Sequence, residues 1–478
     1  MQPPVLVWFR DDLRLADNEA LNAAARSGRP IIALYVLDDE SAWGQPLGGA
    51  ARWWLAGSLR SLSSALAEHG VRLLLKEGKA AQVVPHVAAE LGAALVTFNH
   101  RTGPAEVDTD AAVTDRLQSS GCAVLSFPGH LLHVPGSIVT KNGNLPRTFF
   151  AFYSSARKSR KLAPPSPAPA SLHGTSVTLT DDFAPSDLEP HTPDWAAGLR
   201  ATWQPGEAEA QTRLDDTLSF GLNGYAEGRD FPAAGLSSCL SPHLRFGELS
   251  PRQVLHALHH HREAGDMPAT DAEKFEAEIY WREFAHHLMF AFPQMGTRNL
   301  QTQFNVFPWR TDPENLRAWQ KGQTGYPLVD AGMRQLWQTG WMHNRVRMVV
   351  ASFLTKHLLI DWRVGEAWFR DTLVDADAAS NAANWQWVAG TGMDAAPYFR
   401  IFNPVLQSEK FDQKGEYIRT YVPELAKLPD AALHRPWAAG AGRLAQAGVK
   451  LGETYPHPIV DHDAARARAL LAFKSTQN

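Results

Sequence analysis

The fold of the first part of the chain is decided by two apolar runs, Val5-Leu-Val-Trp-Phe-Arg10 and Pro30-Ile-Ile-Ala-Leu-Tyr-Val-Leu-Asp38. Short runs rich in β-branched and aromatic residues are typical of strands. Three more runs of this kind follow, at residues 71–76, 94–99 and 122–128, and helical stretches separate all five. Strands that alternate with helices predict a parallel sheet with right-handed crossovers, a doubly wound (Rossmann-like) α/β domain.

The helical stretches between these strands are expected at residues 18–27, 48–69, 80–91 and 106–121, with Asp17 as the N-cap of the first. The sequence has no GxGxxG and no Walker A lysine, so no standard dinucleotide or triphosphate site is expected in this domain. Ligands of such sheets bind beyond the carboxyl ends of the strands.

The bulk composition describes an ordinary soluble protein. The chain has 478 residues, 44% hydrophobic and 20% charged residues and a net charge of −4, which argues against a protein that coats nucleic acid indiscriminately. A local basic groove stays compatible with that total. Two distant cysteines make a disulfide framework unexpected. Without a signal peptide or an apolar run long enough to cross a membrane, the chain is predicted to be cytoplasmic. We also expect a monomer.

Prolines mark a connector between domains. Residues 162–205 include the run Ala163-Pro-Pro-Ser-Pro-Ala-Pro-Ala170, which can continue neither a helix nor a central strand. We therefore predict an α/β domain at 1–130, a connector at 131–205 and a helical domain at 206–478. For the basic cluster Ala156-Arg-Lys-Ser-Arg-Lys161, two interpretations stay open, a solvated helix end or a contact with phosphates.

In the helical part, Ser241-Pro242 and Ser250-Pro251 each place a capping hydroxyl before a proline suited to the first helical position. Backbone N–H groups at such helix starts attract anions. Nine of the sixteen tryptophans lie between Phe275 and Asn403, interleaved with Arg, Asn and carboxylates. They fit either an ordinary helical core or a site for a flat cofactor or substrate.

The same blocks carry a resemblance. WREF, TGYPLVDAGMRQL, GWMHNRVRM, IDWR, NWQW and DAAPYFRIFNP are similar to the flavin-binding half of the photolyase/cryptochrome family, and VLVWFRDDLRLADN resembles its opening strand and turn. The resemblance implies an all-α FAD-binding domain after the α/β domain. It further implies a light-driven enzyme that acts on UV-damaged DNA, with FAD active in its reduced form.

The resemblance also implies which residues contact FAD. The counterpart of Asn381 lies beside flavin N5 in the family, and the counterparts of Arg347 and Asp375 pair next to the flavin ring. Cys239 stands where family members usually carry a basic residue. The implied contacts are Tyr225, Ser237, Ser238, Leu240, Ser241, Phe275, Arg282, Trp341, Asn344, Arg347, Asp375, Asp377 and Asn381.

A second set of residues is implied to meet DNA. The family's counterpart of Glu278 bonds the pyrimidine carbonyls of the lesion, so Glu278 and Asn381 are the predicted catalytic residues. From the residues alone, an ordinary intrahelical pair of Glu278 with Arg282 stays open. The implied DNA contacts are Arg229, Glu278, Trp281, Asn344, Arg345, Met348, Trp387 and Gln407.

Four positions distinguish members of the family. Repair of (6-4) photoproducts uses histidines where this chain has Asn344 and Met348, plant-type cryptochromes generally lose Trp281 and Met348, and DASH-type members tend to have Tyr in place of Trp387. The resemblance therefore implies that this combination of residues is the one found in a class I cyclobutane pyrimidine dimer photolyase, a deoxyribodipyrimidine photo-lyase. The alternatives are a cryptochrome-type blue-light photoreceptor without repair activity and a non-enzymatic DNA-binding flavoprotein.

Three tryptophans, Trp385, Trp362 and Trp309, match the family's electron-transfer residues, although each alone is compatible with a core position. No metal is expected, and the histidines at 259–261 and 286–287 are predicted to be surface or capping residues. Three alternatives stay open for an antenna chromophore: a deazaflavin, a divergently bound folate, or an empty pocket. The Asn-Glu pair of folate-binding members is replaced here by Ala105-Glu106.

Overall fold

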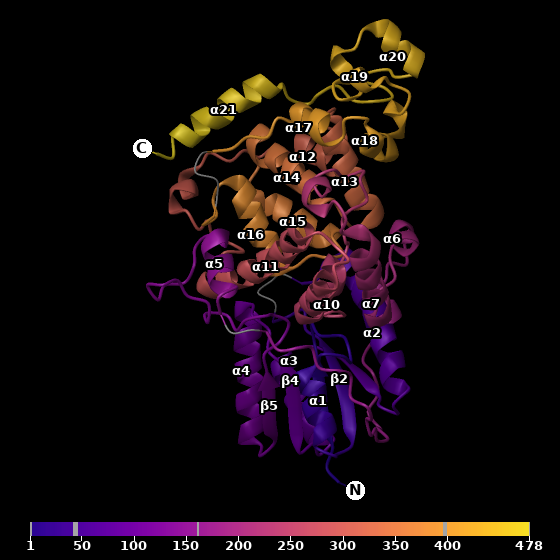
Figure 1. Ribbon diagram of the computed structural model, residues 1–478, viewed down its shortest axis with the longest axis vertical. Coiled ribbons are helices and arrows are strands. Elements are labelled where there is room, and N and C mark those ends of the chain that lie inside the picture. The colour runs from indigo at the N-terminus through magenta and orange to yellow at the C-terminus, as the bar shows by residue number, and fades with distance from the viewer. Residues whose placement is uncertain (1, 42–45, 160–161, 395–398, 478) are drawn as a thin grey trace. The chain divides into compact units, whose positions relative to one another are not determined.

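The computed structural model describes residues 2–41, 46–159, 162–394 and 399–477 (Figure 1). Its residues group into two compact units. The first comprises Met1–Asn223, Ser238–Pro293 and Val374–Ala379, and the second Gly224–Ser237, Gln294–Leu373 and Ser380–Asn478. All five strands lie in the first unit. The predicted fold class, a parallel α/β domain followed by a helical half, is confirmed, whereas the boundaries at 130 and 205 stay a prediction.

The sheet contains the five predicted strands. They are β1 (Val5–Phe9), β2 (Ile31–Leu37), β3 (Leu73–Glu77), β4 (Leu95–Asn99) and β5 (Ala123–Phe127). Their order is β3-β2-β1-β4-β5 and every pairing is parallel, as a doubly wound fold requires. β1 and β2 are buried along their whole length, which explains why their runs are continuously apolar.

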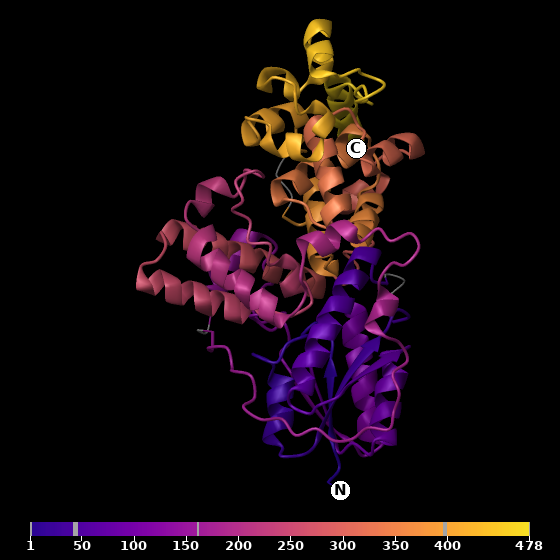
Figure 2. The same ribbon diagram turned by 90° about the vertical axis from the view of Figure 1, so that its right-hand side faces the viewer.

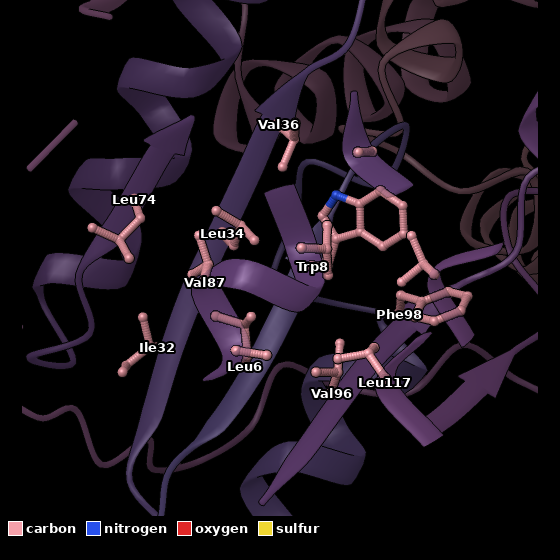
Figure 3. Close-up of a cluster of buried hydrophobic side chains, with 14 residues drawn as sticks. Leu6, Trp8, Ile32, Leu34, Val36, Leu74, Val87, Val96, Phe98 and Leu117 are labelled. Carbon is pink, nitrogen blue, oxygen red and sulfur yellow. The ribbon is translucent and has the colours of Figure 1, made fainter. Parts of the chain in front are cut away.

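Four helices cover this sheet: α1 (Glu19–Arg26), α2 (Gly49–Ala67), α3 (Ala80–Glu90) and α4 (Pro104–Ser119). Figure 3 shows the core on one face, where Leu6, Trp8 and Leu34 of the strands pack with Val87 of α3 and Leu117 of α4. Right-handed crossovers place α1 and α2 on the opposite face.

The N-cap predicted for α1 is wrong. Asn18 caps the helix, because its side chain accepts a hydrogen bond from the backbone N–H of Leu21. Asp17 has a left-handed φ of 53°, and its carboxylate accepts hydrogen bonds of 2.6 Å from Ser250 and Arg252. The acidic residue therefore ties the end of the first strand–helix turn to the helix that begins at Pro251.

The proline-rich segment runs alongside the sheet and forms hydrogen bonds with β2 and β3 (Figure 2). The backbone N–H of Ile31 in β2 donates to the carbonyl of His173 at 2.7 Å. The N–H of Asp182 donates to the carbonyl of Leu75 in β3 at 2.8 Å, and the N–H of Leu75 donates to the carboxylate of Asp181 at 2.9 Å. The segment is thus held by backbone hydrogen bonds, although its prolines prevent a regular strand.

The rest of the first unit is helical. α10 and α11 lie side by side (Figure 2), and α5 packs on α11. Ser250 caps α10 with a capping box to Gln253, and Pro251 occupies the first turn, as predicted. The elements are α5 (Phe149–Ala156), η1 (Pro185–Leu188), α6 (Ala197–Thr202), α7 (Glu207–Asp216), η2 (Thr217–Gly221), α9 (Ser241–Arg245), α10 (Pro251–Ala264) and α11 (Ala269–Ala291).

The second unit is built from helices and short helical turns. Among the described residues, none of the chain's helices has the length and apolar character needed to span a bilayer. The elements are α8 (Tyr225–Gly228), η3 (Thr302–Val306), α12 (Pro313–Gln320), α13 (Pro327–Thr339), α14 (Asn344–Ser352), η4 (Phe353–His357), α15 (Trp362–Thr372), α16 (Ala378–Ala389, whose first two residues group with the first unit), α17 (Pro404–Phe411), α18 (Glu416–Tyr421), η5 (Pro423–Leu425), α19 (Asp430–Leu433), η6 (Pro436–Ala438), α20 (Ala441–Ala447) and α21 (His462–Lys474).

Candidate functional site

The start of α9 holds a distant segment of the first unit. Ser241 Oγ donates a hydrogen bond of 2.6 Å to Asp375 Oδ2, and Arg245 Nε donates one of 2.7 Å to the carbonyl of Ala376. Leu240 is the N-cap of α9 and no side chain caps this helix, so the capping role predicted for Ser241 is wrong. The hydroxyl instead orients the carboxylate of Asp375, which brings two predicted flavin contacts together.

The loop before α9 has a strained backbone. Cys239 has a left-handed φ of 53°, which is uncommon for a residue other than glycine and is found at ligand-binding turns. Ser238, which precedes it, accepts a hydrogen bond of 3.4 Å from the backbone N–H of Leu240. Two further residues predicted for the same contacts, Tyr225 and Ser237, belong to the second unit, where the guanidinium of Arg229 lies 5.5 Å from the ring of Tyr225.

α11 carries four predicted site residues, and it begins six residues before Phe275. Phe275 is buried, whereas the side chain of Glu278 is partly exposed and lies 3.5 Å from Lys274 Nζ. Arg282 donates to the carbonyls of His130 at 3.0 Å and Leu244 at 3.4 Å. The sequence left open an intrahelical ion pair between Glu278 and Arg282. In the structure Glu278 instead forms an ion pair with Lys274.

The ring of Trp281 is held by a neighbouring aromatic side chain. Phe149, the first residue of α5, stacks on it with a centroid separation of 3.7 Å and an angle of 7° between the planes. Phe284 contacts the pair edge-on, 5.9 Å from Trp281. Offset and stacked aromatic contacts of this kind fix the plane of a ring. The indole that the resemblance assigned to the lesion thus has a defined orientation.

His286 connects two loops of the first unit. Its Nδ1 lies 3.0 Å from Thr102 Oγ1 and its Nε2 lies 3.4 Å from Asp377 Oδ2. Burial lowers the pKa of His286 to about 4, so the imidazole is neutral at neutral pH. His286 and His287 are both buried, so their prediction as surface or capping residues is wrong. The cause is their position on the α11 face that contacts α5 and the sheet loops.

α14 presents the second group of predicted residues. Asn344 is exposed as its first residue, and His343 caps the helix through a hydrogen bond from the N–H of Arg345. Arg345 forms an ion pair with Asp230, and its guanidinium lies 4.4 Å from the ring centre of Phe411. Arg345 is therefore already engaged by protein groups. Met348 follows one turn after Asn344 and is half-buried.

Arg347 is oriented within the second unit. Its Nε donates a hydrogen bond of 2.7 Å to the carbonyl of Met342, and its guanidinium lies 5.8 Å from the ring of Trp341. Its predicted partner Asp375 belongs to the first unit, so this pair stays a prediction.

The side-chain amide of Asn381 has a fixed orientation. Its Nδ2 donates to the backbone carbonyl of Glu366 at 3.0 Å and to Glu366 Oε1 at 2.8 Å. Glu366 is buried, which raises the pKa of its carboxyl. Because both hydrogens of the amide nitrogen face Glu366, the carbonyl oxygen of Asn381 faces the opposite direction. This side chain can therefore offer a neighbour an acceptor rather than a donor.

The three tryptophans predicted to form an electron relay differ in burial. Trp385 and Trp362 are buried, and Trp309 is half-exposed beside Phe307, with 4.4 Å between ring centres. Trp362 and Gly365 are three residues apart on α15 and share a face of that helix. A Cβ atom on Gly365 would lie 2.5 Å from Trp385 Cζ3, so Trp385 packs against the same face. Of the three, Trp309 alone reaches solvent appreciably, as the outer member of the predicted relay needs.

Trp387 lines a cavity of about 160 Å³ in the second unit, together with Lys356 and Arg400. Lys356 is buried and donates a hydrogen bond of 2.6 Å to the carbonyl of Ala389, and burial lowers its pKa well below the usual value. Gln407 is half-buried, and its Oε1 has no hydrogen-bond partner among the described residues.

The chain matches known proteins over nearly its whole length. Residues 5–170 match the family model described as DNA photolyase, and residues 275–475 match the FAD binding domain of DNA photolyase. The deoxyribodipyrimidine photo-lyase of Agrobacterium fabrum is 50% identical over 478 residues, 99% of this chain and 98% of that relative. The chain belongs to the DNA photolyase family.

Two further relatives show the breadth of that family. The crystal structure of a bacterial class III photolyase from Agrobacterium tumefaciens has a TM-score of 0.96 and 50% identity, and the match covers 100% of this chain and 98% of that one. Cryptochrome-1 of Arabidopsis thaliana is 38% identical over 97% of this chain and 69% of its own length. The predicted family and its FAD-binding domain are confirmed, and the assignment to class I is not.

Reasoning from the sequence missed three residues that contact predicted site residues: Phe149 contacts Trp281, His286 contacts Asp377 and Glu366 contacts Asn381. Glu366 lies fifteen residues from Asn381, and a buried carboxylate on an amphipathic helix gives no local signal of its partner. Arg160 and Lys161 of the predicted basic cluster, and residues 395–398 of the last family-like block, lie outside the described residues.

The close approach of Gly365 to Trp385 gives a testable prediction. Gly365→Ala should destabilise the photolyase by about 1–3 kcal/mol, because an added methyl group overlaps the indole ring. Gly442→Ala is the matched control, since a Cβ at Gly442 in α20 meets nothing within 4 Å. Urea denaturation of the two variants measures the difference. Equal midpoints would mean that α15 or Trp385 moves at little cost.

Proposed function

We propose that the protein splits cyclobutane pyrimidine dimers in DNA under blue light. The observation that carries the proposal is the presence of Trp281, Asn344, Met348 and Trp387 together in a member of this family. A relative that is 50% identical over the whole chain is named deoxyribodipyrimidine photo-lyase, which supports the same reaction.

The residues present suit a bound FAD. Trp385 Nε1 is buried and has no hydrogen-bond partner among the described residues, which is unusual for an indole N–H unless a ligand accepts from it. Ser241 with Asp375, Asp377 with His286 and Asn381 with Glu366 provide oriented polar groups. The remaining contacts we propose are Tyr225, Ser237, Ser238, Leu240, Phe275, Arg282, Trp341, Asn344 and Arg347. Reduced FAD, when bound and excited by light, supplies the electron that opens the cyclobutane ring.

The protein's own groups would hold the lesion. A dimer stacks poorly, so extruding it from the duplex costs less than extruding an intact base. Trp281 offers a ring whose plane Phe149 fixes, and Glu278 lies three residues before it on α11. Glu278 and Asn344 would hydrogen-bond the pyrimidine carbonyls, while Met348 and Trp387 would exclude water from the apolar edge of the dimer. Gln407, Arg229 and Arg345 would contact the strand.

The class within the family is a further part of the proposal. We infer class III, because the relative with 50% identity and full coverage is described as a class III photolyase. The second chromophore, a folate or a deazaflavin, stays a prediction. The absorption spectrum of the purified protein tests it, because a bound folate or deazaflavin adds a band to that of FAD.

Illumination of the chemically reduced protein with defined oligonucleotides tests the function. We expect cyclobutane dimers in duplex DNA to be split and (6-4) products to be left intact. A pocket with Asn344 and Met348 lacks the histidines that (6-4) repair uses. Turnover of the (6-4) substrate would contradict the proposal. Failure on both substrates would favour the second candidate, a blue-light photoreceptor, which the 38% identity to Cryptochrome-1 supports.

Binding to the lesion is expected to weaken with salt despite the net charge of −4. Lys158 is exposed at the end of α5, near the proposed lesion side of the first unit. Lys158→Ala should reduce the slope of log K against log salt by roughly 0.9, the value for one lost phosphate contact. The exposed Lys427 supplies the control, and its replacement by Ala should leave the slope unchanged. Filter-binding titrations at several salt concentrations measure both.

A further inference from the structure

Two adjacent phenylalanines at the start of α5 have opposite surroundings. Phe149 lies in the stack with Trp281, 3.7 Å from its ring. Phe150, the next residue, is 81% exposed. Among the described phenylalanine, tyrosine and tryptophan residues, only Phe150 and Phe220 are more than two-thirds exposed, and of these two only Phe150 adjoins a predicted site residue's stack. Phe150 therefore presents an apolar ring to solvent, one residue along α5 from the ring that stacks on Trp281.

The backbone under Phe150 is firmly held. Thr148 caps α5 by accepting a hydrogen bond from the N–H of Ala151. Phe152 is fully buried, and its ring lies 5.5 Å from Phe284 and 4.8 Å from His287 of α11. Consecutive Cα atoms are about 3.8 Å apart, so the base of Phe150 stays next to the Phe149–Trp281 stack. Phe150 is thus an aromatic group in a defined position and not part of a loose terminus.

Four cations flank Phe150 along the chain. Lys141 and Arg147 precede it and Arg157 and Lys158 follow it, and all four are exposed. Arg157 is partly neutralised by Glu276, whose Oε1 lies 3.6 Å from its Nε. An exposed aromatic ring among cations is the combination that binds a nucleic acid strand, because the ring stacks on a base while the cations meet phosphates.

We propose that Phe150 stacks on the nucleobase next to the dimer, an inference that rests on the proposed function. When the dimer leaves the duplex, the neighbouring base loses a stacking partner, and unstacking costs a few kcal/mol. The exposed ring of Phe150, one residue along α5 from the ring that supports Trp281, would restore that contact. Phe150 would then stabilise the extruded state without touching the reacting atoms.

Fluorescence of 2-aminopurine in the dark tests this inference. The base analogue is placed on either side of a thymine dimer in a duplex, and its fluorescence is followed as the FAD-loaded protein is added. Stacking on Phe150 should quench the analogue on one side of the dimer. Phe150→Ala should abolish that quenching and raise Kd about five- to a hundredfold, the range for loss of one base–aromatic stack.

Three further variants make the result specific. Phe150→Trp should restore both quenching and affinity, and Phe150→Leu should not, because leucine is apolar but cannot stack as an aromatic ring. Phe220→Ala is the matched control. Phe220 is 82% exposed and lies in η2, which packs on α7 and α10. This variant should bind as the wild type does.

The outcomes separate this inference from the proposed function. Wild-type protein that fails to split the dimer contradicts the proposed function. Protein that splits the dimer, but whose Phe150→Ala variant keeps the wild-type Kd and quenching, overturns the role of Phe150. An equal loss of affinity for undamaged duplex would also overturn it, since the contact would then not belong to the extruded state. Because Phe150 is exposed, its variants should keep the wild-type melting temperature and flavin absorption.

Discussion

Trp309→Phe is expected to remove most of the photoreduction of oxidised FAD. Trp309 is the half-exposed member of the three relay tryptophans, and Trp385 and Trp362 are buried. An electron that leaves Trp385 for the flavin must be replaced by a reductant in solution, and in the predicted relay it passes through residue 309. Phenylalanine at that position blocks the transfer, because it is much harder to oxidise than tryptophan. Repair by chemically reduced protein should persist, because the relay only prepares the reduced cofactor. Absorption spectra during blue illumination measure the first effect and an oligonucleotide assay the second.

Trp195→Phe is the control for this experiment. Trp195 is a partly exposed tryptophan of the first unit, and its replacement should leave the photoreduction rate unchanged. If Trp309→Phe also kept the wild-type rate, the electron would enter by another route. The ring of Trp319 lies 6.4 Å from that of Trp385 and would be the next position to test.

The α/β domain could be predicted from sequence because its signals are local. Each strand is one apolar run between turn residues, and all five predicted strands are found within two residues of their predicted ends. The N-cap of α1 could not be read in the same way. Asp17 and Asn18 are both suitable cap residues, and the choice depends on Ser250 and Arg252, more than two hundred residues away, which bind Asp17.

In the candidate site, too, residues with local sequence signals could be predicted, whereas contacts between distant residues could not. The family resemblance suggested Trp281, Asn381 and Asp377, but not the side chains that orient them. Phe149 lies 132 residues before Trp281, and Thr102 lies 184 residues before His286. No periodicity or motif spacing relates residues so far apart, because their contact is created by the packing of α5 and the sheet loops on α11. The sequence could therefore suggest which groups meet the ligands, but not the side chains that orient those groups.

Glu278→Ala is expected to lower the quantum yield of dimer repair several-fold. The partly exposed carboxyl of Glu278 lies on α11 three residues before Trp281, where it can reach the carbonyl oxygens of a dimer packed on that ring. A protonated or hydrogen-bonded carboxyl stabilises the negative charge that develops on the dimer when it accepts an electron. Flavin absorption and dimer affinity should remain close to wild type. The yield is measured by counting repaired dimers per absorbed photon.

Lys274 provides the control that separates chemistry from helix stability. The two side chains form an exposed pair at i and i+4, and such a pair contributes only about 0.3–0.5 kcal/mol. Lys274→Ala breaks that pair and leaves the carboxyl in place, so the quantum yield should stay at the wild-type value. Glu278→Gln keeps a hydrogen-bond donor and should lose less yield than Glu278→Ala. If Lys274→Ala lowered the yield as much as Glu278→Ala does, the carboxyl would act only through its ion pair on α11.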